Sequence, residues 1–102
     1  MAALQTFAPA YTSGVTVAPT NVSANSILGF NNKTICLTNL GTVVCYVRTF
    51  KRSDGIVAAT TADYPVPFAQ VTISKPDDHD SIAYVVVGGT AGSLHIMGGE
   101  GW

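Results

Sequence analysis

Charged residues are scarce in this sequence. Only 11% of the 102 residues are Asp, Glu, Lys or Arg, whereas an ordinary soluble domain contains about 25%. The formal net charge is −1, so the chain is not built to neutralise a phosphate backbone, and we expect no nucleic-acid partner. The longest unbroken apolar run, residues 82–87, is much shorter than the about 20 residues that span a bilayer, so we expect no membrane contact.

Residues that favour helices are also few. The chain has one Glu and three Lys, against twelve Val, twelve Thr and six Ile, and β-branched residues favour strands. Ten Gly and five Pro lie between short apolar runs and supply turns. We therefore predict an all-β chain: a single antiparallel β-sandwich, jelly-roll-like, of about eight short strands, with an extended arm over residues 1–11, the sandwich over 12–97 and a tail over 98–102.

Short apolar runs give the expected strands. They are predicted near residues 12–18, 26–30, 56–59, 69–74, 81–87 and 93–97. Residues 63–68 contain two prolines, which remove ladder donors, so this segment is predicted to be an extended loop or an edge.

The strongest local pattern covers residues 34–49, where two apolar runs flank Asn39-Leu40-Gly41-Thr42. Asn and Gly tolerate the positive φ of tight turns, so the pattern predicts a hairpin. In that register Cys36 lies opposite Cys45, at a Cβ separation wider than a disulfide prefers. Without an export signal, two reduced and buried thiols are the expected state, and a disulfide is the less favoured alternative.

The sequence contains no arrangement typical of an active site. Asp77-Asp78-His79-Asp80 is the only dense group of potential metal ligands, but it lacks the register of a calcium loop, and a solvated turn is the favoured interpretation. His95 lies in an apolar strand and is interpreted as a structural or interface residue. No base stands beside a Ser or Cys in a recognisable pattern, and no glycine-rich phosphate loop is present, so we expect no enzyme, no cofactor, no metal and no small-molecule substrate.

The only basic cluster consists of Arg48, Lys51 and Arg52, with Phe50 among them. Cations beside an aromatic ring are found at single-strand nucleic-acid sites, but the near-neutral chain argues against that reading. We favour a pairing with the acidic residues Asp77, Asp78 and Asp80, within one subunit or between two.

Eight of the eleven charged residues lie in residues 48–54 and 75–80. The remaining surface is therefore expected to meet the partners.

Several stretches follow one another from residue 34 to the end: Leu-Thr-Asn-Leu-Gly-Thr at 37–42, Val-Val-Cys-Tyr-Val-Arg at 43–48, Ala-Asp-Tyr-Pro-Val-Pro at 62–67, Gln-Val-Thr-Ile at 70–73, Ile-Ala-Tyr-Val at 82–85, Gly-Thr-Ala at 89–91, Leu-His-Ile at 94–96 and Gly-Glu-Gly at 99–101. In this order they resemble short bacteriophage virion structural proteins of similar length. Where such proteins often place Pro before the terminal Gly-Glu-Gly, this chain has Gly98.

The resemblance implies a non-enzymatic capsid decoration or cement subunit. Its partners would be the major capsid protein and copies of itself, with a trimer favoured, on the outer surface of a virion whose proteins are made in the host cytoplasm. The alternatives are a neck or tail subunit, or a small carbohydrate-binding module that uses Tyr64, Phe68 and Trp102. Low charge suits burial against other subunits. The candidate interface residues are Phe7, Tyr11, Arg48, Lys51, Arg52, Asp77, Asp78, Asp80 and Trp102.

Overall fold

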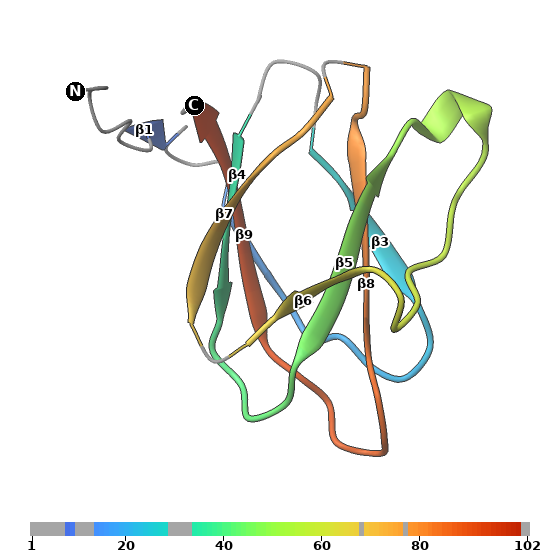
Figure 1. Ribbon diagram of the computed structural model, residues 1–102, viewed down its shortest axis with the longest axis vertical. Coiled ribbons are helices and arrows are strands. Elements are labelled where there is room, and N and C mark those ends of the chain that lie inside the picture. The colour runs from blue at the N-terminus through green and yellow to red at the C-terminus, as the bar shows by residue number, and fades with distance from the viewer. Residues whose placement is uncertain (1–7, 10–13, 29–33, 68, 77, 101–102) are drawn as a thin grey trace.

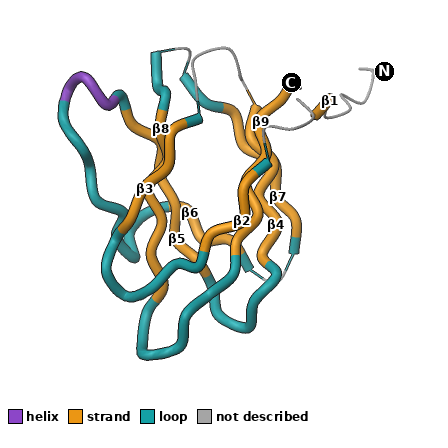
Figure 2. The backbone as a smooth tube through the Cα atoms, turned by 180° about the vertical axis from the view of Figure 1, so that it is seen from behind, coloured by secondary structure: helices purple, strands orange, loops and turns teal. Residues whose placement is uncertain are grey.

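The chain folds into two antiparallel sheets that face each other (Figures 1 and 2). The computed structural model describes residues 8–9, 14–28, 34–67, 69–76 and 78–100. One sheet has the order β1-β9-β4-β7, with β2 also paired to β9, and the other has the order β3-β8-β5-β6. The strands are β1 (Ala8–Pro9), β2 (Val15–Val17), β3 (Ala24–Ile27), β4 (Thr34–Asn39), β5 (Cys45–Phe50), β6 (Tyr64–Val66), β7 (Gln70–Ser74), β8 (Ser81–Val86) and β9 (Leu94–Glu100), and a 3-10 turn η1 covers Arg52–Asp54.

The strand pairing is that of a jelly roll. The innermost pair in the sequence is β5 with β6. The pairs on either side of it, moving outward along the chain, are β4 with β7, β3 with β8 and β2 with β9. The chain is thus one long nested hairpin, folded over so that β4 also pairs with β9 and β5 with β8. This arrangement confirms the predicted antiparallel sandwich with jelly-roll character. The described part of the chain contains no helix with the length and apolar character that a membrane crossing requires.

The core lies between the sheets and consists of the inward-facing side chains of both. Ile35 and Leu37 of β4 are fully buried, as are Leu94 of β9 and Val66 of β6, and Val47 of β5 is 1% exposed. Alternate residues of a strand point to the same face, so each strand contributes every second residue to this layer. Burying one such side chain contributes about 1.5–3 kcal/mol relative to leaving it exposed.

Strand β8 is buried on both faces, along its whole length. Its inner face belongs to the main core, whereas Ala83 and Val85 on its outer face form a second cluster with Phe50 and Ala59. Ala59 lies in the long connection between β5 and β6, which crosses the outside of this sheet. An apolar strand at the centre of a sheet is thereby covered without a second subunit.

The predicted hairpin over residues 34–49 is wrong. Its first strand, β4, belongs to one sheet and its second, β5, to the other, so the connection over residues 40–44 crosses between the layers. Cys36 therefore lies opposite Thr72 and Met97 rather than opposite Cys45. Both cysteines are buried free thiols, which confirms the reduced state that we expected.

Three further expectations need correction. Residues 56–59 form no strand: Ile56 and Val57 are exposed, and this segment belongs to the connection that covers β8. Strand β9 runs to Glu100 instead of ending at Met97, because Gly98 and Gly99 pair with β4, so residues 98–100 belong to the sandwich and not to a tail. In the expected arm, Ala8–Pro9 pairs with β9, and the other arm residues lie outside the described part.

Candidate functional site

The basic and acidic loops meet within one subunit, at the end of the sandwich where β5 ends and β8 begins. The backbone N–H of Arg52 donates to the carboxylate of Asp80 over 2.9 Å. The Arg52 guanidinium donates to Ser81 Oγ over 3.0 Å and to Asn25 Oδ1 over 2.6 Å, and it lies 5.5 Å from the centre of the Phe50 ring. This cation is therefore engaged by its own subunit, which leaves little of it to bind a phosphate group.

This contact also affects the pKa of Asp80. The hydrogen bond from the Arg52 backbone lowers the pKa of Asp80 below its ordinary value, and the Ser81 hydroxyl and the Arg52 charge act in the same direction. Asp80 is thus an ionised residue that links the two loops.

Of the other predicted interface residues, Lys51 is half-buried and Asp78 is exposed. Phe7, Tyr11, Asp77 and Trp102 lie outside the described residues.

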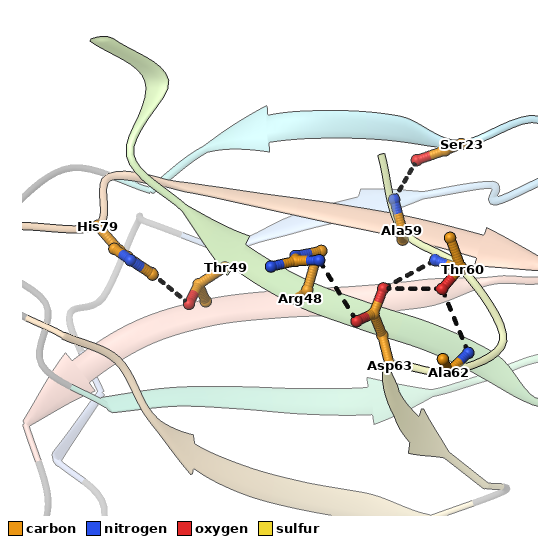
Figure 3. Close-up of polar contacts among 8 residues, drawn as sticks. All are labelled: Ser23, Arg48, Thr49, Ala59, Thr60, Ala62, Asp63 and His79. Carbon is orange, nitrogen blue, oxygen red and sulfur yellow. Dashed lines mark hydrogen bonds and ion pairs between the residues drawn. The ribbon is translucent and has the colours of Figure 1, made fainter. Parts of the chain in front are cut away.

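Arg48 has a different partner from the one that we predicted. It lies 3.7 Å from Asp63, just before β6, on the outer side of the sheet (Figure 3). The other Asp63 oxygen accepts a 2.8 Å hydrogen bond from the backbone of Thr60 (Figure 3), which closes the turn that leads into β6. Sequence reasoning missed Asp63, because only the return of the β5–β6 connection brings it beside Arg48.

Both histidines bond to threonine hydroxyls. His79 Nδ1 lies 2.8 Å from Thr49 Oγ1 (Figure 3), and His95 Nδ1 lies 2.9 Å from Thr16 Oγ1. A nucleophile also needs a group that orients its base, and among the described residues neither imidazole has a carboxylate partner. No group of three His, Cys, Asp or Glu side chains in this part of the chain could hold a metal ion.

An open groove of about 360 Å³ lies where the edges of the two sheets face each other. Its lining combines apolar side chains of the core margin with hydroxyl and charged groups: Val47, Arg48, Thr49, Asp63, Tyr64, Ile73 and Ser74. Strand β6 is only three residues long, so it leaves this side of β5 partly uncovered. The Tyr64 side chain is 47% exposed at this groove.

Among the residues that the structure describes, those at the end of the sandwich opposite the charged loops are all uncharged. This end consists of the described residues of four connections, namely 18–23, 40–44, 67, 69 and 87–93, which lie together at the lower end in Figure 1. None of these residues is Asp, Glu, Lys or Arg. We call this surface the uncharged end. Three of its aliphatic side chains are highly exposed: Val22 at 71%, Leu40 at 61% and Val87 at 61%.

Hydrogen bonds hold the connections of the uncharged end together. The N–H of Leu40 donates to the carbonyl of Ser93, and the N–H of Gly92 donates to the carbonyl of Pro19, each over 2.8 Å. The backbone of Gly41 approaches Ser93 so closely that a Cβ atom would lie 2.8 Å from its nitrogen. The surface is therefore ordered by its own backbone contacts before any partner binds.

Comparisons with protein-family models, with curated proteins and with solved structures gave no match for this chain. The case for a function therefore rests on the residues and on their arrangement.

Proposed function

We propose that this protein is a non-enzymatic structural subunit of a bacteriophage virion, a decoration subunit that self-associates and stabilises the major capsid shell. The observation that carries the proposal is the uncharged end, where Val22, Leu40 and Val87 are exposed on a surface without any charged residue. The cores of protein interfaces are depleted in charge and rich in apolar atoms, so a surface of this kind suits contact with another subunit.

Two further observations support the proposal. The jelly-roll sandwich is an architecture that viral capsid domains use, although it also occurs in lectins and enzymes, so it supports a role only by analogy. In addition, Arg52 and Asp80 are engaged within the subunit, and each histidine bonds to a threonine. These side chains have structural partners, and a structural role needs no reactive group.

The test is to measure the chain in purified particles of the virus that encodes it. Quantitative mass spectrometry should find it in proportion to the major capsid protein, and imaging should place it on the outer shell. Particles without it should lose their genome at a lower temperature. A copy number that fits a single ring would indicate the alternative neck or tail location, and absence from the particles would overturn the proposal.

The groove at Tyr64 favours one other candidate function, the binding of a neutral saccharide. An exposed tyrosine ring provides an apolar face with a polar tip, and Arg48 and Asp63 supply donors and acceptors whose charges cancel. Binding to a glycan array, lost in Tyr64→Ala and retained in the control Ile56→Ala, would support this candidate. Failure of the wild-type protein to bind any glycan would dismiss it.

A further inference from the structure

The uncharged end is best matched by a surface that is also free of charge. All eleven charged residues lie elsewhere in the sequence, and the described ones include Lys51, Arg52, Asp54 and Asp78 in the connections at the opposite end of the sandwich. Burying a charge without a partner is costly, so a charged surface would be a poor match for this end. The chain itself offers a matching surface, namely the same end of another copy.

We propose that the uncharged end docks against the uncharged end of a second copy of this chain, in a two-fold contact that replaces the trimer implied by the resemblance. The inference rests on the self-association that the proposed function includes, and it names the surface and the symmetry. In such a contact each residue near the axis meets its own image. Like charges brought together in this way cost several kcal/mol, which the uncharged end avoids and the opposite end does not.

The size of the end allows a contact at the lower limit of specific interfaces. The two shorter dimensions of the molecule are 31 and 26 Å, so its whole cross-section is about 600 Å². A contact that buried all of it on both copies would reach about 1,200 Å² in total, which is the lower limit for a specific interface. Val22, Leu40 and Val87 would supply its apolar centre. The exposed residues Thr20, Asn21, Thr42 and Thr90 supply hydrogen-bonding groups that need no charged partner.

The order within the end favours association. Ordering mobile loops on binding opposes association, but here backbone hydrogen bonds already join residues 40 to 93 and 92 to 19. Gly41 allows the close approach of two of the connections. The aliphatic side chains therefore lie on a backbone that is already ordered, so less conformational entropy is lost when two copies associate.

The test is the mass of the purified full chain in solution, measured by sedimentation equilibrium over concentrations up to about 100 μM, a range that detects dissociation constants in the micromolar region. We expect the mass of two chains. Each of the substitutions Val22→Asp, Leu40→Asp and Val87→Asp should raise the dissociation constant about tenfold or more, because it places two like charges at the contact.

Two matched controls distinguish the loss of this contact from the effect of placing an aspartate at any exposed aliphatic residue. Ile27 and Ile56 are 70% and 62% exposed, as much as the test residues, but they lie outside the uncharged end. Ile27→Asp and Ile56→Asp should leave the dissociation constant unchanged. Circular dichroism would show that all five variants keep the β-fold, which is expected because none of these side chains is buried.

Three results would overturn the inference: a monomer at every concentration, a trimer, or a dimer that the three aspartates do not weaken more than the controls. The proposed function fails by a different measurement, since it requires the chain to be present on particles. A monomer that still decorates particles would refute self-association, and with it the two-fold contact, but would leave the virion role standing. A dimer absent from particles would refute the virion role alone.

Discussion

The side-chain amide of Asn39 donates a 2.9 Å hydrogen bond to the carbonyl of Val66, which belongs to the other sheet. The same amide donates to the carbonyl of Val43 over 2.8 Å, while its oxygen accepts the N–H of Gly41 over 2.9 Å. One buried side chain thus satisfies three backbone groups where the chain leaves β4 and crosses to β5. Asn39 stabilises a crossing between sheets, where the sequence pattern had suggested a tight turn.

Replacing Asn39 should therefore destabilise the fold. In Asn39→Ala the carbonyls of Val43 and Val66 lose their donor, and we expect a loss of about 2–4 kcal/mol in the free energy of unfolding, because buried unsatisfied groups cost about 1–3 kcal/mol each. Chemical denaturation measures this loss. Asn21→Ala, at an exposed position of the neighbouring connection, should change stability by less than about 0.5 kcal/mol. Equal effects at both positions would contradict the role of Asn39.

The close approach of Gly41 to Ser93 predicts that a methyl group is not tolerated there. A Cβ atom at residue 41 would lie 2.8 Å from the backbone nitrogen of Ser93, whereas one at Gly89 would meet nothing within 4 Å. Gly41→Ala should cost about 1–3 kcal/mol, as overpacking usually does. Gly89→Ala should be close to neutral. Thermal unfolding of the two variants gives the comparison, and a harmless Gly41→Ala would show that the connections can separate.

Stability should depend on the ionisation of Asp80. Its pKa is lowered in the folded protein by the Arg52 backbone N–H, so the ionised form stabilises the fold above the unfolded value, and this contribution is lost as the pH falls through the folded value. Asp80→Asn should therefore lower the unfolding temperature at pH 7, and the difference from wild type should shrink in strong acid. The exposed Asp78→Asn is the control. A deficit of equal size at both pH values would contradict this linkage.

The two cysteines should be unreactive in the folded protein. Cys36 is 6% exposed and Cys45 is fully buried, and burial raises the pKa of the Cys45 thiol, which disfavours the reactive thiolate. Labelling with a thiol reagent at neutral pH should be slow until denaturant is added, and should then modify two groups. Rapid labelling of the native protein, or its failure to label after unfolding without reductant, would contradict two buried free thiols.

The fold class could be predicted from local properties of the sequence. β-branched residues, frequent turn residues and short apolar runs are local properties, and they correctly placed most strands and the Pro-containing edge β6. The segregation of charge was also visible in the sequence, since eight of eleven charged residues lie in residues 48–54 and 75–80.

The pairing of the strands depends on contacts between residues that are far apart in the sequence. A five-residue connection after Asn39 fits both a turn within one sheet and a crossing between two, and in the crossing Asn39 bonds to the distant carbonyl of Val66. The partners of Arg48 and Arg52 likewise depend on contacts with residues far along the chain. The four uncharged connections are far apart in the sequence, and each follows an even-numbered strand, β2, β4, β6 or β8. The jelly roll gathers them at one end of the sandwich because these four strands all end there.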